Sequence, residues 1–231
     1  MTPIRVAIIS PSALASAGPV PAVFQELWPE ADPINIIDES LYADYAKTRV
    51  IDAALVRRLD SLLRHSELSG ARIAVFTGSV FGAIVEATRR TMRIPVLASY
   101  EAMIEAAFAS GSRLCVLTTS PYSMANITED IARYAERHGK AYTQTSRVLD
   151  AARIAFREKG DIREHFRLIA GAVAECRDCD AVLLGQTSMD PAYALIPPVP
   201  GRPVLTPLRT TVLKMRRMLS SEGLSQAPAA P

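Results

Sequence analysis

The sequence is poor in the residues that would point to a bound metal, a nucleic acid or a membrane. Its 231 residues include three histidines and three cysteines, and these have no metal-ligand spacing. The formal net charge is +2 and the Lys and Arg residues are scattered, which excludes a basic nucleic-acid surface. Apolar runs are about as long as strands, far short of the roughly 20 residues that span a bilayer. Because the N-terminus also lacks a signal-peptide pattern, we expect a cytoplasmic protein.

Nucleotide-binding patterns and a complete cysteine motif are lacking too. Neither Gly-x-Gly-x-x-Gly nor a phosphate-binding loop occurs, so we expect no cofactor. Cys176 and Cys179 form a Cys-x-x-Cys pair that follows a helical pattern and precedes a strand, whereas a thioredoxin-like pair opens a helix. We interpret them as two thiols near a helix end. Cys115 lies in an apolar run and is predicted to be a small core residue.

Short aliphatic runs alternate with helical patterns along the chain. This alternation predicts βαβ units, and apolar strands without strict period two are typical of parallel sheets that are buried on both faces. The predicted strands are 5–9, 34–37, 73–77, 96–98, 114–118, 142–148, 181–185 and 204–206. The fold class is therefore α/β.

The chain also repeats itself. Val6–Pro11 matches Val116–Pro121 at an offset of 110 residues. Two further matches have similar offsets: Ala74–Ser79 with Leu183–Ser188 at 109, and Pro95–Leu97 with Pro203–Leu205 at 108. Three matches in one order predict two pseudo-symmetric Rossmann-like lobes, each with a parallel four-stranded sheet, facing a central cleft.

The repeat sets the expected boundaries of the lobes. The first lobe comprises residues 1–98 and a returning helix at 207–219, and the second comprises residues 99–206. The tail, residues 220–231, is small, polar and proline-rich, so we expect disorder there.

Each repeated segment is a strand end that runs into a turn rich in Ser, Thr and Gly before a helix. Ligands of open α/β sheets bind beyond the carboxyl ends of strands, where free N–H groups at helix starts favour an anion. We therefore predict a small-carboxylate site. Its candidate binding residues are Ser10, Ser12, Gly78, Ser79, Thr118, Thr119, Ser120, Thr187 and Ser188.

The order and spacing of these turns resemble the aspartate/glutamate/hydantoin racemase superfamily, which includes arylmalonate decarboxylase and maleate isomerase. The resemblance extends to about Leu219. It rests on Ile8–Ser12, Val75–Ser79, Ile94–Val96, Gly111–Tyr122 and Asp180–Met189. It implies a cofactor-independent enzyme of the racemase or isomerase class that acts at the carbon next to a carboxylate of a small organic or amino acid.

The resemblance also implies an atypical member. Each half of the racemases supplies a cysteine for proton transfer on one face of the substrate carbon. Thr77 and Gln186 stand at those positions here, and neither side chain is a base near pH 7. Arylmalonate decarboxylase uses one cysteine and a Gly-Thr-Ser turn, which Thr77–Ser79 resembles. A decarboxylase, or a carboxylate-binding protein without catalysis, therefore remains an alternative.

Four residues are candidates for catalysis: Thr77 and Gln186 by position, and Asp38 and Tyr122 by chemistry. Asp38 ends the second strand, and it is either an acid/base with a raised pKa or the cap of the next helix. Tyr122 is either a ligand contact or proton donor, or a residue that packs at the rim. Gln186 is either an amide that stabilises an enolate, or a neighbour of a helix cap. The expected partner is a small carboxylate substrate, with neither nucleic acid nor membrane. The expected assembly is a homodimer, the commonest default, or a higher homo-oligomer.

Overall fold

The structure is a computed structural model that describes residues 3–13 and 18–225. It divides into two compact units, residues 1–99 with 211–231 and residues 100–210. Each unit contains one four-stranded parallel sheet, in the orders β2-β1-β3-β4 and β6-β5-β7-β8. The predicted α/β class with two parallel four-stranded sheets is confirmed.

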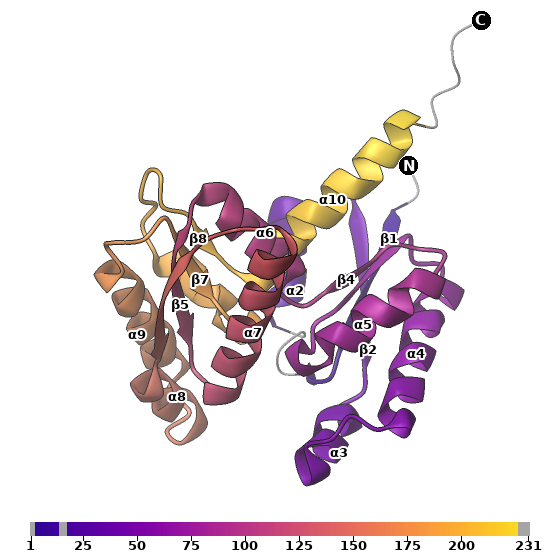
Figure 1. Cartoon of the computed structure of the whole chain (residues 1–231), viewed down its shortest axis with the longest axis horizontal. Coiled ribbons are helices and arrows are strands. Elements are labelled where there is room, and N and C mark those ends of the chain that lie inside the picture. The colour runs from indigo at the N-terminus through magenta and orange to yellow at the C-terminus, as the bar shows by residue number, and fades with distance from the viewer. Residues whose placement is uncertain (1–2, 14–17, 226–231) are drawn as a thin grey trace, which may run out of the picture. The chain divides into compact units, whose positions relative to one another are not determined.

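The sheet of the first unit is covered by helices that connect its strands (Figure 1). Ala7 and Ile9 of β1 and Phe76 of β3 pack with Leu59 of α4 and Val85 of α5 in one buried cluster. The strands are β1 (Ile4–Ser10), β2 (Ala31–Ile37), β3 (Ile73–Phe76) and β4 (Val96–Ala98). The helices are α2 (Pro19–Leu27), α3 (Ser40–Thr48), α4 (Ala53–Leu68), η1 (Ser79–Phe81), α5 (Gly82–Thr88) and η2 (Arg89–Thr91).

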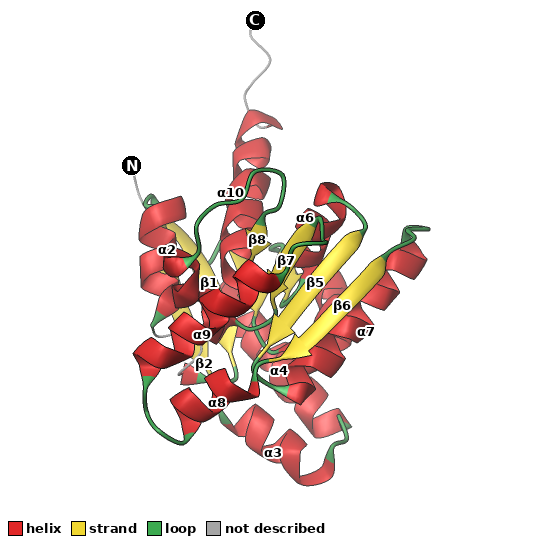
Figure 2. Ribbon diagram, turned by 90° about the vertical axis from the view of Figure 1, so that its left-hand side faces the viewer, coloured by secondary structure: helices red, strands yellow, loops and turns green. Residues whose placement is uncertain are grey.

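The sheet of the second unit buries both faces. Leu114 and Val116 of β5 join the apolar cluster of α6 and α7, whereas Cys115 and Leu117 join that of α8 and α9, so successive side chains alternate between faces. Figure 2 shows α8 and α9 on one side of β5 and β6 and α7 on the other. The strands are β5 (Arg113–Thr118), β6 (Thr143–Val148), β7 (Ala181–Leu184) and β8 (Val204–Leu205). The helices are α6 (Glu101–Ser110), α7 (Pro121–Arg137), α8 (Asp150–Arg157), α9 (Ile162–Glu175) and η3 (Thr187–Leu195).

The last helix, α10 (Pro207–Ser225), crosses the boundary between the units at residue 210. Its Arg216 donates from Nη1 to the carbonyl oxygen of Leu27 at 2.8 Å, which ties the helix to α2 of the first unit. The helix includes residues 220–225, and the disorder expected of the tail from residue 220 stays a prediction. Ser and Glu continue a helix at small cost, and a single glycine costs about 1 kcal/mol. Residues 226–231 lie outside the described residues.

The strand register corrects the offsets of the internal repeat. Thr77 N donates to Ile9 O at 2.9 Å, and Gly185 N donates to Leu117 O at 2.8 Å. These pairs are related by an offset of 108 residues, and the same offset relates the β3–β4 and β7–β8 pairings. Thr77 therefore corresponds to Gly185, and the counterpart of Gln186 is Gly78. The expected match of Thr77 with Gln186 is wrong by one residue. Thr77 is the first residue after β3, whereas Gln186 is the second residue after β7, so matching similar residue types aligned different positions.

Candidate functional site

The turn after β1 uses its hydroxyl group within the turn. Ser10 is buried, and its Oγ donates to Ser12 O at 2.9 Å and accepts from Ser12 N at 3.2 Å. The backbone N–H of Ala13, the residue after Ser12, donates to Glu39 Oε1 at 3.0 Å, and this bond holds the end of the turn. The structure thus brings Ser10 and Ser12 together as predicted neighbours, in a closed turn of the Ser/Thr type.

The turn after β3 has no room for a side chain at its centre. A Cβ atom added to Gly78 would lie 2.4 Å from Phe76 Cε1 and 2.9 Å from Pro11 Cγ. Thr77, beside it, directs its hydroxyl to Ile9 O at 3.4 Å. Neither position presents an acid or a base, and the close approach of Phe76 explains why glycine occupies position 78.

A residue that the sequence analysis missed, Tyr42, lies at this same turn. Its phenol oxygen accepts hydrogen bonds from the side chain and the backbone N–H of Ser79. Its ring stacks on Phe81, with ring centroids 5.9 Å apart. Burial raises the pKa of Tyr42, and the two hydrogen bonds from Ser79 offset this in part. Tyr42 therefore keeps its proton at neutral pH and can donate it.

Asp38 is an ion-pair partner that stays ionised. Its Oδ2 lies 2.8 Å from Arg58 Nη2, and its Oδ1 accepts from Ser40 N at 3.1 Å and from the Ser40 hydroxyl. Burial alone would raise its pKa, but the hydrogen bonds from Ser40 and Arg58 outweigh burial and hold the pKa below the usual value. This direction is opposite to the raised pKa that a catalytic acid requires. The bond to Ser40 N, two residues on, closes a turn of the Asp/Asn type directly before α3, whose N-cap is Glu39.

In the second unit the turns after β5 and β7 are joined by side-chain hydrogen bonds. Thr119 donates to Gln186 Oε1 from both its N–H, at 2.6 Å, and its Oγ1, at 2.9 Å. The oxygen of the Gln186 amide is thus fixed, which identifies the other end as the NH₂ group, a donor of two hydrogens. Thr118 is buried and donates from Oγ1 to Ser120 O at 3.0 Å. The structure therefore brings Thr118, Thr119, Ser120 and Gln186 close together, and their binding of a ligand stays a prediction.

Helix α7 begins beside these residues. It has 17 residues, Pro121 at its first turn, and Ser120 as N-cap without a side-chain cap. Its first N–H groups are thus suited to an anion. Tyr122 lies in this first turn and is 65% exposed.

A buried ionic network, also missed from the sequence, supports the turn after β7. Asp190 of η3 is 3% exposed and accepts a hydrogen bond from the Thr206 hydroxyl. Arg209 Nη1 lies 3.9 Å from Asp190 Oδ2, and its guanidinium lies 4.1 Å from the ring centre of Tyr193. Thr187 is buried and Ser188 half-buried in the same element. Asp190 therefore fixes η3, which begins directly after Gln186.

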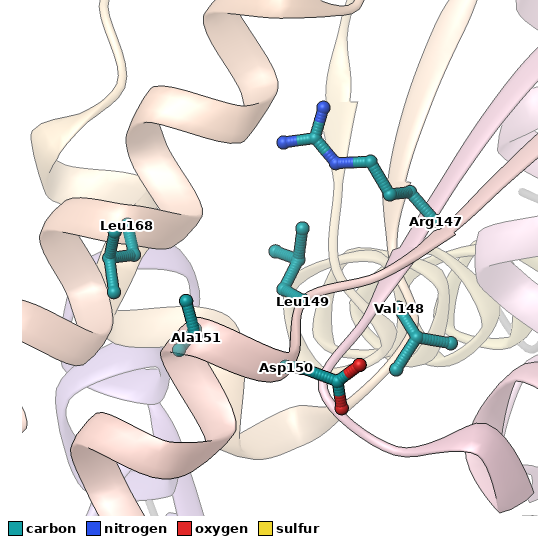
Figure 3. A pocket seen from close by; sticks show the side chains of 7 residues that line it. Arg147, Val148, Leu149, Asp150, Ala151 and Leu168 are labelled. Carbon is teal, nitrogen blue, oxygen red and sulfur yellow. The ribbon is translucent and has the colours of Figure 1, made fainter.

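Two cavities of the second unit lie beside β5 and β6, and the first borders the turn after β5, because Leu149 N donates to Thr118 O at 2.7 Å. The first, of about 240 Å³, is lined by residues 147–152 and Leu168 where β6 ends and α8 begins (Figure 3). Arg147 and Asp150 point in opposite directions there. The other, of about 200 Å³, surrounds the cysteines. None of the predicted catalytic or binding residues lines either cavity.

Two features relevant to ligands are absent from the described part of the chain. In residues 3–13 and 18–225, no group of three or more His, Cys, Asp or Glu residues is placed to hold a metal ion. Within the same ranges, no helix is long and apolar enough to cross a membrane.

The fold and these turns define a class of proteins with two α/β units of equal sheet order. The sequence profile of the Asp/Glu/Hydantoin racemase family matches residues 20–215, and the chain belongs to this family. No curated protein sequence matches the chain.

Solved structures share the fold at low sequence identity. An aspartate racemase homologue from Pyrococcus horikoshii OT3 has a TM-score of 0.68 at 15% identity, covering 95% of this chain and 100% of its own. Allantoin racemase from Klebsiella pneumoniae has a TM-score of 0.62 at 17% identity, covering 95% and 89%. Arylmalonate decarboxylase has a TM-score of 0.62 at 19% identity, covering 98% and 96%. At such identities the similarity concerns the fold alone.

Proposed function

We propose that the chain is a cofactor-independent enzyme that acts at the carbon next to the carboxylate of a small organic or amino acid. Membership of the racemase family supports this class of reaction. The hydroxyl-rich turns support a carboxylate as the group that is bound. Its proposed contacts are Ser79, Thr119 and the first turn of α7. Ser10, Ser12, Thr118, Ser120, Thr187 and Ser188 shape these turns.

Proton transfer by two opposed thiols is not supported by the residues present. The corresponding positions of the two units hold Gly78, which has no side chain, and Gln186, which does not titrate. Thr77 directs its hydroxyl to a backbone carbonyl. If the enzyme is a racemase or isomerase, as the family implies, it uses other groups.

Decarboxylation fits these residues best, and the fixed Gln186 amide is the observation that carries this choice. When a carboxylate leaves as CO₂ from the carbon of a malonate-type acid, the C–C electron pair passes to the remaining carboxylate as an enediolate. Donors aimed at such a developing charge lower the barrier most effectively. Because Thr119 holds the oxygen of the Gln186 amide, we propose that its NH₂ group donates to that charge.

Decarboxylation also needs one proton donor. We propose Tyr42 as this donor, because its phenol lies at the turn after β3 beside the proposed carboxylate contact Ser79. Asp38, with its lowered pKa, is proposed to fix Arg58 and the start of α3, the helix that carries Tyr42. Tyr122 is proposed as a contact of the substrate carboxylate at the start of α7.

The test is a screen of substituted malonates and α-substituted mono- and dicarboxylic acids. Loss of CO₂, isomerisation and α-proton exchange in D₂O are followed by NMR. Tyr42→Phe should lower turnover strongly, whereas Tyr45→Phe on the same helix, whose ring also contacts Phe81, should not. A triple Cys→Ser variant should retain turnover. If it folds but loses turnover, thiol chemistry operates and our assignment is wrong.

The outcome of the screen also separates catalysis from binding. If several acids bind in calorimetry and none turns over or exchanges a proton, the chain is a carboxylate-binding protein. The expected homodimer or higher homo-oligomer and the expected cytoplasmic location stay predictions, which sedimentation and cell fractionation test.

A further inference from the structure

All three cysteines of the sequence lie in the second unit and gather at one place in its fold. Cys115 belongs to β5, Cys176 directly follows α9, and Cys179 lies shortly before β7. All three are free thiols; Cys115 and Cys179 are buried and Cys176 is half-buried. The first of them comes from a segment far away in the sequence, so the cluster is a product of the tertiary structure.

The thiol that interacts with Cys176 is Cys115, not Cys179 of the Cys-x-x-Cys motif. The side chains of Cys115 and Cys176 line the same cavity and interact with each other, and Cys176 donates from Sγ to Ala172 O at 3.4 Å. Cys179 instead directs its sulfur to the carbonyl oxygen of Cys176 at 3.6 Å. A disulfide within the cluster would thus form most readily between Cys115 and Cys176.

A cavity gives small solutes access to this cluster. Its volume is about 200 Å³, and its lining includes the three cysteines, Thr145 and Arg147. Hydrogen peroxide or a small organic hydroperoxide is small enough for such a space. The half-buried Cys176 is the most accessible of the three thiols.

The charges around Cys176 favour its thiolate. The hydrogen bond from Cys115, together with the positive charges of Arg147 and Arg202, lowers the pKa of Cys176, although burial and the negative charge of Glu175, the ion-pair partner of Arg147, act in the opposite direction. Arg202 is held at the site by donating from Nη1 to the Cys176 carbonyl oxygen. The same hydrogen bond and burial raise the pKa of Cys115, and burial raises that of Cys179. An accessible thiolate beside a second thiol is the arrangement of oxidation-sensitive cysteines.

We infer that Cys176 is a modification site for hydroperoxides and that Cys115 converts the oxidised product into a disulfide. The Cys176 thiolate attacks the O–O bond, so that an S–O bond forms and an alkoxide or hydroxide leaves and takes up a proton. Cys115 then attacks the sulfur of the sulfenic acid; the S–S bond forms, the S–O bond breaks, and hydroxide leaves with the Cys115 proton as water. The two thiols lose two electrons, and the hydroperoxide gains them.

The disulfide would join the middle of β5 to the end of α9. Strand β5 continues directly into Thr118 and Thr119, so oxidation would crosslink the strand that leads to the proposed carboxylate turn. The inference rests on the thiol cluster alone and does not depend on the proposed function.

The experiment treats the full chain with hydrogen peroxide and maps the products by mass spectrometry without reduction. The wild type should lose two hydrogen atoms and yield a Cys115–Cys176 peptide, and Cys179→Ser should do the same. Cys115→Ser should stop at a Cys176 sulfenic acid that dimedone traps. Cys176 should react about tenfold or more faster than Cys179. Arg147→Gln, with folding checked by circular dichroism, should slow the reaction of Cys176.

Three results would overturn the inference. They are a Cys176–Cys179 disulfide in the wild type, a Cys176 sulfenic acid that persists while Cys115 is present, and a Cys176 that reacts no faster than Cys179. Should Cys115→Ser unfold because a hydroxyl is buried in the core, Cys115→Ala tests the same step.

Discussion

The two units share their sheet order and strand register, but they differ at one equivalent position in the turns. This position holds Gly78 after β3 and Gln186 after β7. In the first unit this position is closed by Phe76 and Pro11. In the second unit it carries an amide held by Thr119. The comparison shows that a duplicated framework preserves the backbone of a turn while its two copies supply different groups.

Support for each turn also differs between the units. In the first unit, Tyr42 of α3 is hydrogen-bonded to Ser79 of the turn. In the second unit, the buried Asp190 of η3 contacts Thr206 and Arg209. A phenol can donate a proton, while a buried ion pair only fixes geometry. We therefore expect the chemical role to be divided unequally between the units.

The largest expected effect tests the amide of the second unit. Gln186→Ala should lower turnover of the identified acid by about 100-fold, as losing a donor to a developing charge does. Steady-state kinetics measure this, with the exposed Gln25→Ala on α2 as control. Equal turnover in the two variants would assign Gln186 a structural role only.

The next effect tests the closed position of the first unit. Gly78→Ala should destabilise the chain by about 2 kcal/mol, because the added Cβ must displace Phe76 or Pro11. Urea unfolding measures the change. Gly171→Ala within α9 is the control: no atom lies within 4 Å of its Cβ, so it should stabilise by about 0.5–1 kcal/mol. A neutral Gly78→Ala would mean that the turn adapts to a side chain.

A smaller effect concerns the bond between the turns of the second unit. Thr119→Val removes the hydroxyl that donates to Gln186 Oε1 and retains the backbone donor. Ligand affinity should fall by about 1 kcal/mol. Thr143→Val, an exposed threonine on the edge strand β6, should leave calorimetric affinity unchanged. A larger loss for the control would place the site elsewhere.

The smallest effect is a pH dependence of stability at the opposite end of β7. Hydrogen bonds from the Arg113 side chain and backbone lower the pKa of Asp180 from 3.8 to about 2. A depressed pKa stabilises the fold above the unfolded-state pKa, and this contribution disappears as the pH falls from about 4 to about 2. Asp180→Asn should therefore be less stable than the wild type at pH 7, and the difference in urea midpoint should close over that interval. A difference that persists at pH 2 would indicate a cause other than charge.

Much of the fold was predictable because it depends on local patterns. Buried aliphatic runs and helical periodicity identified the eight strands, and the repeated Ser/Thr/Gly turns at their ends indicated Thr118, Thr119 and Gln186 as candidate ligand contacts, a role that stays a prediction. The repeat predicted two units, but similar dipeptides after β1 and β5 misplaced the offset by up to two residues. Hydrogen bonds between strands, which the sequence does not display, set the true register.

What the sequence by itself determined is the α/β class, the parallel sheets, the family resemblance and the lack of a thiol at the predicted catalytic positions. Only the tertiary structure decided that Gly78 mirrors Gln186, that Tyr42 reaches Ser79, that Asp38 stays ionised beside Arg58, and that Cys115 meets Cys176. The physical reason is the range of the interactions. Strands, helices and turns follow from neighbouring residues, whereas pKa values and side-chain partners depend on groups that the fold brings together from distant segments.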